Sequence, residues 1–324
     1  RFKMRVWFLK QTSSICTESS TGVNTTVWSR EGKIYRITPR RNDAVNDTWM
    51  SDSGREILRE VDAAHRMTAP QVRGAAADLE SALTTAGEIL RAGAVGVVGS
   101  GHQTIEEQRL LMHFTQATQA KAYVPARAGS ADGLLISEDR TPNFRGALLA
   151  GLTNRAADRD LSALKADIDA GRVRTLLVCR EDVTTLGLDA TTLAKVRMVY
   201  IGLHNDATAK AAEVVLPALS VFERSGHFVN CQFRVQSFVR AIPGPVGTLP
   251  DVAILARLLG SVTGQPAAFD ADSLWKDLAA KQPALADLSP SKVPSDGVIV
   301  DGSAWANLSF PEGKLLKFAP ATKA

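Results

Sequence analysis

Cysteine and histidine are the side chains of this sequence that could ligate a metal or act as nucleophiles. Cysteine occurs three times, at widely separated positions: Cys16, Cys179 and Cys231. Histidine occurs five times, as His65, His102, His113, His204 and His227. Because no C-x-x-C or H-x-x-x-H pair occurs, the sequence does not predict a zinc site. Three scattered cysteines also argue against a disulfide framework and favour a reducing compartment.

The turn Gly99-Ser100-Gly101 is a second candidate for chemistry, because it follows a strand-like run and precedes a helical pattern. Backbone N–H groups at such a turn can hold an anion. However, Thr104 stands where a dinucleotide fingerprint has its third glycine, and residues 120–123 lack the acidic side chain that would hold a ribose. We therefore favour a structural turn, and a free-standing nucleotide-binding enzyme stays as an alternative.

Short apolar runs alternate with helical patterns along the middle of the chain. Strand-like runs occupy residues 94–98, 173–179, 196–203 and 214–219. Helical patterns occupy residues 104–120, 161–170, 188–195, 207–212 and 251–263. This alternation predicts an α/β fold with a doubly wound, mostly parallel sheet and helices on both faces.

The first sixty residues follow a different pattern. Residues 5–9, 25–28 and 33–37 alternate like strands, which predicts a small β-rich module. Between residues 57 and 90 the apolar residues recur every three to four positions, which predicts amphipathic helices. The resulting division is a module at residues 1–60, an α/β domain at residues 61–270 and an irregular C-terminal tail at residues 271–324.

Composition narrows the class of protein further. The chain has 324 residues, of which 45% are hydrophobic and 22% charged, as in an ordinary globular protein. Its net charge of +4 is mild, and no nucleic-acid-binding motif accompanies it, so no nucleic-acid partner is expected. No apolar run approaches the roughly 18 residues of a membrane span, so no direct membrane insertion is expected. Because the sequence opens without Met in a strand-like run, we expect a longer parent polypeptide.

The residues around Cys16 carry the most specific pattern. Cys16, Ser19, Val23 and Ser51 stand at C-x2-C-x3-C-x27-C spacing, with cysteine only at the first position. Flanking residues that belong to the pattern include Gly22, Trp28, Pro39-Arg40, Asn46 and Gly54-Arg55. This region resembles the iron–sulfur module at the start of the molybdopterin oxidoreductase fold, in the version found in the large iron–sulfur subunit of respiratory complex I, NADH-quinone oxidoreductase.

Two later stretches are similar to the same family. One is Asp139-Arg140-Thr141-Pro142-Asn143 within the loop-like residues 131–146. The other is a block formed by Val215-Leu216-Pro217, Glu223, Gly226, Asn230, Arg234 and Gln236. Together with the first stretch they extend the resemblance over most of residues 1–260.

The cofactor sites that the resemblance implies lack their expected side chains. A 4Fe-4S cubane normally needs a thiolate on each iron, whereas Ser19 and Ser51 offer hydroxyls and Val23 offers no donor. We therefore expect no cluster here, with side-chain packing in its place. Relatives that bind a pterin usually carry lysine where Ser53 stands and often glycine where Phe233 stands, so neither molybdenum chemistry nor catalytic residues are expected in this segment.

The resemblance implies a structural and assembly portion of the peripheral arm of a complex I-like NADH-quinone oxidoreductase. Electron transfer from NADH to quinone would use clusters elsewhere, with 2Fe-2S and 4Fe-4S clusters expected in an upstream region. The implied partners are other peripheral-arm subunits, and the implied location is cytoplasmic, on the cytoplasmic face of the inner membrane through the complex. Arg36, Arg40 and Arg41 are candidates for contacts to those subunits, with a solvated face as the alternative. A catalytically active molybdopterin oxidoreductase of the formate dehydrogenase kind is a further alternative.

Overall fold

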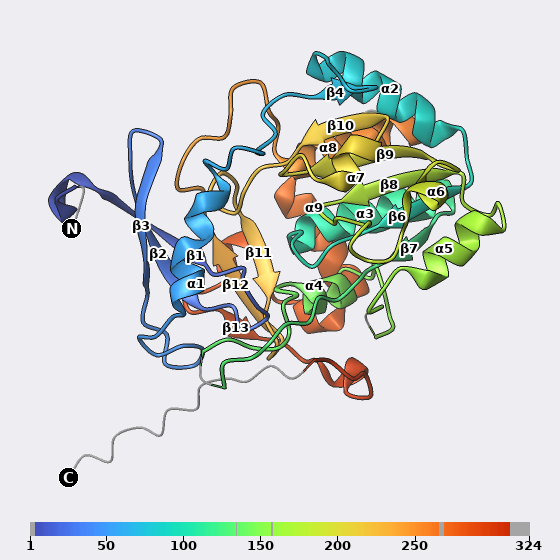
Figure 1. Ribbon diagram of the computed structural model, residues 1–324. Coiled ribbons are helices and arrows are strands. Elements are labelled where there is room, and N and C mark those ends of the chain that lie inside the picture. Colours follow the sequence, from blue (N-terminus) through green and yellow to red (C-terminus); the bar gives the residue numbers. More distant parts are fainter. Residues whose placement is uncertain (1–3, 134, 157, 266–268, 312–324) are drawn as a thin grey trace, which may run out of the picture.

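The N-terminal part is a three-stranded antiparallel sheet. The computed structural model describes residues 4–133, 135–156, 158–265 and 269–311 (Figure 1). Strands β1 (Lys10–Ile15), β2 (Asn24–Arg30) and β3 (Lys33–Pro39) pair in that order. The predicted β-rich module is confirmed, but a strand at residues 5–9 is wrong. There Val6–Phe8 forms a 3-10 turn, because the β1–β2 pairing begins only at Lys10 opposite Ser29.

The central sheet has seven strands in the order β5-β4-β10-β9-β8-β6-β7. Its parallel members are β6 (Val95–Val98), β7 (Lys121–Tyr123), β8 (Thr175–Cys179), β9 (Arg197–Gly202) and β10 (Val214–Pro217). Strands β4 (Gln71–Val72) and β5 (Ala75–Ala76) add a short antiparallel edge. The mostly parallel sheet predicted from the alternating pattern is confirmed.

Helices cover both faces of the central sheet (Figure 1). One face carries α2 (Leu79–Arg91), α3 (Ile105–Thr118) and α8 (Asp251–Thr263). The other carries α5 (Ser162–Asp169), α6 (Ala190–Leu193) and α7 (Ala207–Ala211). Neighbouring strand residues point to opposite faces, so Leu177 packs with the first group and Leu176 with the second. Within the described ranges, no helix has the length and apolar character that a membrane span requires.

Two regions differ from the predicted elements. Residues 57–90 are not helical throughout: α1 (Asp52–Glu56) runs into the 3-10 turn Ile57–Glu60, and β4 and β5 form a hairpin before α2 starts. Arg73 and Gly74, both with positive φ, make the turn of that hairpin. The predicted helix at residues 188–195 is also shorter, since only α6 forms there.

The C-terminal part is more regular than predicted. Helix α9 (Ala271–Lys281) stands where an irregular tail is expected, because its Trp275 and Leu278 are buried against Ile105 of α3 and Leu149 of α4 (Phe144–Leu149). Strands β11 (Gly226–Val229), β12 (Arg234–Phe238) and β13 (Val298–Ile299) form a third sheet. Between α9 and residue 311, the end of the described chain, three 3-10 turns form, at Pro283–Leu285, Pro290–Lys292 and Ser303–Trp305. Residues 312–324 of the predicted tail lie outside the described residues.

The N-terminal sheet shares its core with residues far along the chain. Ile15 and Val27 belong to the same buried cluster as Phe222, Phe228 and Phe238. At the edge of the sheet, the backbone N–H of Val239 donates to Ser13 O at 3.4 Å. Strand β1 therefore lies beside β12, as Figure 1 shows.

Candidate functional site

The loop of residues 16–23 joins β1 to β2 and carries the first three of the four cluster positions. A backbone hydrogen bond from Cys16 N to Val23 O, at 2.8 Å, closes the loop. Ser51, at the start of α1, comes close to it: its Oγ and the Cys16 Sγ lie 2.9 and 3.0 Å from where a Cβ would stand on Gly54. Ser19 turns to Thr21 instead, donating to its Oγ1 at 3.3 Å. The structure thus brings Cys16 and Ser51 together, while Ser19 turns to a neighbour within the loop.

Cys16 supplies a thiol at the first of the four cluster positions, whereas Ser19, Val23 and Ser51 supply none. Burial is the main cause that raises the pKa of the Cys16 thiol to about 12, so this thiol is protonated at neutral pH when no metal ion is bound. Val23 and Met50 belong to the same apolar cluster. In the described part of the chain, no three Cys, His, Asp or Glu side chains gather to hold a metal ion. A 4Fe-4S cluster does not fit these residues.

Residues from the later family-like stretches hold this loop in place. The hydrogen bonds join Asn230 Nδ2 to Thr21 O at 3.0 Å, Gln236 Nε2 to Gly22 O at 2.9 Å, and Ser20 N to Asp139 O at 2.9 Å. These roles could not be predicted from the sequence, because no local pattern links positions more than a hundred residues apart. The only signal for them was their shared membership of the family-like stretches.

Replacing Gly22 with alanine is expected to lower the free energy of unfolding by about 2–3 kcal/mol. Gly22 has a φ of +66°, and an added Cβ would overlap Gln236 Oε1 and lie 3.0 Å from Asn230 Cβ. Gly171→Ala is the matched control, because Gly171 has a φ of +71° with nothing within 4 Å of an added Cβ. Urea unfolding should show a clearly smaller loss for the control; equal losses would show that the contact with Gln236 is unimportant.

The Gly99-Ser100-Gly101 turn uses its own donors internally. Ser100 N donates to Gln103 Oε1 at 2.9 Å, and Ser100 Oγ donates to the Glu181 carboxylate at 2.5 Å. The predicted capping box between Thr104 and Glu107 is present at the start of α3 and occupies further donors. Gly101 packs directly on Thr141, since an added Cβ would overlap that side chain. These contacts favour the structural turn over a nucleotide site.

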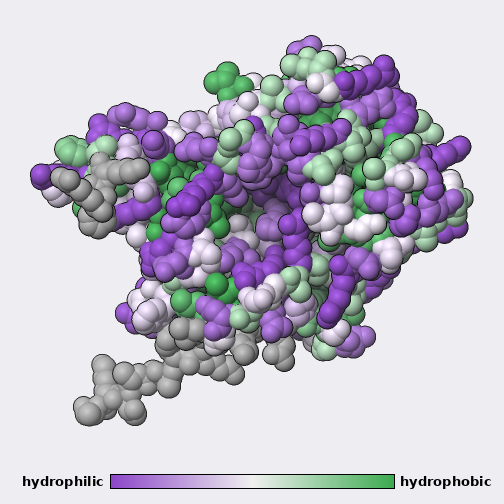
Figure 2. All heavy atoms as spheres, in the orientation of Figure 1, coloured by the Kyte–Doolittle hydropathy of each residue, from purple (hydrophilic) through white to green (hydrophobic). Residues whose placement is uncertain are grey.

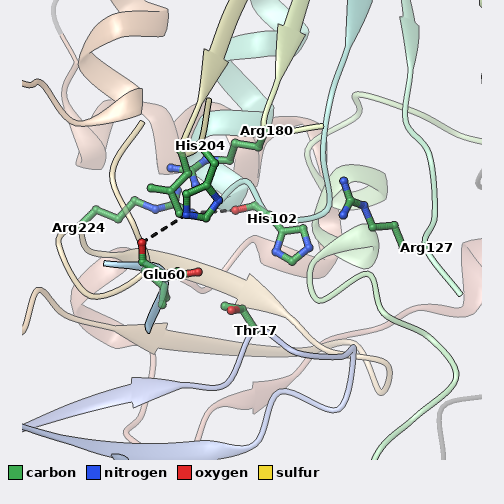
Figure 3. Close-up of a pocket in the computed structure, with 9 residues that line it drawn as sticks. Thr17, Glu60, His102, Arg127, Arg180, His204 and Arg224 are labelled. Atoms are coloured by element: carbon green, nitrogen blue, oxygen red, sulfur yellow. Dashed lines mark hydrogen bonds between the residues drawn. The ribbon is translucent and has the colours of Figure 1, made fainter. Parts of the chain in front are cut away.

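A polar pocket of about 240 Å³ lies at the carboxyl ends of the parallel strands. Figure 2 shows a hollow edged by hydrophilic residues at the centre of this face. His102 follows β6, Arg180 follows β8 and His204 follows β9. Figure 3 shows Glu60 and Thr17 facing them from the N-terminal part. Ligands bind at this end of open α/β sheets, and sequence reasoning missed the pocket although its residues follow predicted strands.

The cations of this pocket are already paired with buried carboxylates. Arg180 contacts Asp251 at 2.7 Å, Arg127 contacts Glu181 at 2.6 Å and Arg224 contacts Glu107. Burial and the surrounding arginines lower the pKa of His102 to about 3, so it is neutral. An incoming anion would have to compete with these carboxylates for each guanidinium. The pocket is also smaller than the roughly 300–1,000 Å³ typical of ligand sites.

Phe233 fills the place where relatives often carry glycine. It adopts a φ of +58°, which is unusual for a bulky residue. Its ring stacks on Trp305, with ring centroids 5.6 Å apart and an interplanar angle of 9°, and it lies against Gly302. At the lysine position of relatives, Ser53 instead donates a hydrogen bond to Glu18. Phe233 and Ser53 are therefore both engaged in contacts within the protein.

The natural chain is expected to lose stability as the pH rises from about 4.5 to 7, and Glu60→Gln is expected to abolish this loss. Burial raises the pKa of Glu60 to about 7, although Arg180, Arg66 and Arg224 oppose this. Over this window the folded chain therefore keeps a proton that the unfolded chain releases, and the free energy of unfolding falls as pH rises, by up to about 1.4 kcal/mol per pH unit. Glutamine cannot ionise, so the free energy of unfolding of the variant should not show this fall. Relative to the natural chain, the variant should therefore be about 2–3 kcal/mol more stable at pH 8 than it is at pH 4.

Urea unfolding at both pH values measures the effect of Glu60→Gln. Glu56→Gln, at an exposed position on the preceding turn, is the control and should show no pH-dependent gain. If the Glu60→Gln variant gains equally at both pH values, the carboxyl group does not titrate near neutrality.

The three arginines suggested as partner contacts have different surroundings. Arg40 donates to Ser295 O at 2.8 Å and pairs with Asp296 at 3.1 Å, so it ties the N-terminal sheet to the loop before β13. Arg36 is half-buried, with its guanidinium 4.2 Å from the centre of the Trp28 ring. Arg41 is exposed and pairs with Asp43. A role in partner contacts stays a prediction, and Arg41 offers the most accessible charge of the three.

Comparison with known families agrees with this architecture. Residues 88–261, which are 174 of the 324, match the family model of the molybdopterin oxidoreductases. Because this match spans more than half of the chain, the chain belongs to the molybdopterin oxidoreductase family. Residues 9–58 match a second model, described as NADH-ubiquinone oxidoreductase NDSU1/NuoG-like, 4Fe-4S domain. That second match includes all four cluster positions.

Similar individual proteins point to one branch of the family, the NuoG-like subunits of NADH-quinone oxidoreductase. The one from Rickettsia felis is 22% identical over 81% of this chain and 57% of its own length. The one from Streptomyces coelicolor is 32% identical over 36% of this chain and 15% of its own length. That of Rickettsia prowazekii is 46% identical over 17% of this chain and 8% of its own length. The resemblance drawn from the sequence is confirmed, and the chain aligns with less than two thirds of each of these relatives.

Proposed function

We propose that this chain is a structural and assembly part of the peripheral arm of a complex I-like NADH-quinone oxidoreductase. In this proposal it contributes no catalytic residue and binds neither a cluster nor a pterin. Electrons pass from NADH to quinone through clusters outside residues 1–324, in an upstream region or in neighbouring subunits. Its partners are other peripheral-arm subunits, which hold it on the cytoplasmic face of the inner membrane. The similarity to the NADH-quinone oxidoreductase subunits of Streptomyces coelicolor and Rickettsia felis supports the assignment to the arm.

The observation that carries the structural role is the state of the loop at residues 16–23. Three of the four cluster positions lack thiols, yet long-range hydrogen bonds from Asn230, Gln236 and Asp139 still hold the loop. A loop that is kept in shape without its metal ligands supports packing as its present task. The division into a module at residues 1–60, an α/β domain at 61–270 and a tail at 271–324 belongs to the same proposal, although the first two share a buried cluster.

A chromosomal affinity tag on the full-length protein tests the assignment in its own organism. Membranes solubilised in mild detergent are separated on a native gel and stained for NADH oxidation. We expect the tagged protein to migrate with the NADH-oxidising complex, and deletion of its gene to reduce the amount of assembled complex. Migration of the tagged protein away from that complex, with assembly unaffected by the deletion, would overturn the proposal.

Two measurements on the purified protein address the alternatives. Molybdenum or an extractable pterin bound to the protein would establish a molybdopterin enzyme, against which the small pocket and Phe233 argue. Saturable binding of NADH to the isolated chain would establish a nucleotide-binding enzyme, against which the internally bonded turn at Ser100 argues.

A further inference from the structure

Glu18 lies in the loop of residues 16–23, between the first and second cluster positions. Its carboxylate accepts a hydrogen bond from Ser51 Oγ at 2.5 Å and another from Ser53 Oγ. It also pairs with Arg140 Nη1 at 3.3 Å. The Glu18 side chain is only 16% exposed, so this carboxylate is largely enclosed by its three partners.

The partners of Glu18 are two serines at the start of α1 and one arginine from a distant segment. Ser51 stands at the fourth cluster position and Ser53 at the position where pterin-binding relatives carry lysine. Arg140 belongs to the loop-like stretch at residues 131–146. One carboxylate therefore connects the loop at residues 16–23 with the start of α1 and with Arg140, which lies more than eighty residues after α1 in the sequence.

The bond between Glu18 and Ser51 also orients α1. Ser51 is the N-cap of α1, and its Oγ accepts from Gly54 N at 3.0 Å while its hydroxyl proton is donated to Glu18. Gly54 in turn contacts Cys16, since an added Cβ would lie 3.0 Å from its Sγ. Hydrogen bonds to a charged acceptor are stronger than neutral ones, so a carboxylate suits this cross-link.

We propose that Glu18 performs the cross-linking that an iron–sulfur cluster would otherwise provide between the Cys16 loop and the start of α1, and that it extends this link to Arg140. This inference rests on the proposed function, in which the loop binds no cluster. A cubane bonded to the first and fourth cluster positions would join the same two segments through covalent bonds. Glu18 joins them through hydrogen bonds to the two serines and an ion pair with Arg140.

Hydrogen exchange on the full-length protein tests the role of Glu18. In Glu18→Ala, backbone exchange in residues 16–23 and at the start of α1 should be about ten- to hundredfold faster than in the natural chain. Glu18→Gln keeps one carbonyl acceptor but loses the charge, and should fall between the two. Glu31→Ala removes an exposed carboxylate that pairs with Arg30 and should leave exchange in these segments unchanged.

A second variant keeps the inference testable if Glu18→Ala does not fold. Ser53→Ala removes one exposed partner of Glu18 without touching the core, and should accelerate exchange at the start of α1 by a smaller factor. Unchanged exchange in both Glu18→Ala and Ser53→Ala would overturn the inference. Iron is measured in the same samples: about four irons per natural chain at the Cys16 loop would overturn the proposed function instead.

Discussion

Replacing Arg145 with alanine is expected to lower the free energy of unfolding by about 3–5 kcal/mol. Arg145 pairs with Asp139, and both side chains are at most 4% exposed. Removing the guanidinium leaves the Asp139 carboxylate buried with only neutral donors, such as Thr141 N at 3.0 Å. Because Asp139 O also accepts from Ser20 N, the loss should loosen the loop at residues 16–23 as well.

Urea unfolding followed by circular dichroism measures this loss. Arg155→Ala is the matched control, because Arg155 forms an ion pair with Asp158 at 2.8 Å on the surface. Surface pairs of this kind contribute about 0–1 kcal/mol, so the control should stay close to the natural chain. A loss below about 1 kcal/mol for Arg145→Ala would show that Asp139 finds water or another partner when its arginine is removed.

Anaerobic reconstitution with iron and sulfide is expected to leave the natural chain without a cubane. A variant that carries Ser19→Cys, Val23→Cys and Ser51→Cys is expected to take up about four irons per chain, because four thiolates then stand at the family spacing. The hydrogen bond from Cys16 N to Val23 O already closes the loop of residues 16–23, which carries the first three cluster positions. Replacing Ser51 with cysteine also removes one of the hydrogen bonds that hold Glu18 in place.

The matched control for reconstitution carries only Ser19→Cys and Val23→Cys, which leaves one iron without a thiolate. Iron analysis and the visible absorption of the cluster distinguish the three proteins. A stable cubane in the natural chain would show that one thiolate and the neighbouring hydroxyls suffice, against the expectation from ligand chemistry. Failure of the triple variant to bind iron would show that the loop no longer has the geometry of a cluster site.

Helices and strands were predicted correctly where neighbouring residues in the sequence determine them. Helix α8 was predicted with its observed bounds, and α3 was located by the capping box of Thr104 and Glu107. The hairpin of β4 and β5 was missed, because its residues happen to continue the apolar spacing of the helices beside it. Helix α9 was missed in a region punctuated by proline, since the burial of Trp275 against α3 and α4 is a tertiary effect.

The candidate site was only partly predictable for the same reason. The spacing of Cys16, Ser19, Val23 and Ser51 located the loop, and the residue types indicated that a cluster would not fit. The bonds of Glu18 to Ser51 and Ser53 span 33 and 35 residues, and the ion pairs of the pocket arginines Arg180 and Arg224 span 71 and 117 residues. No periodicity or local motif encodes contacts of that range.

The hydrogen bond from Gln236 to Gly22 joins residues that are far apart in the sequence, and this affects how the chain folds during its synthesis on the ribosome. The backbone of residues 16–23 is synthesised first, but its hydrogen-bonding partners at residues 230–236 emerge more than two hundred residues later. Until then the N-terminal strands lack Phe228 and Phe238 to cover their apolar face. An N-terminal fragment that stops before β12 should therefore stay open to proteases and chaperones, and native structure near Cys16 should be acquired only after translation has passed Phe238.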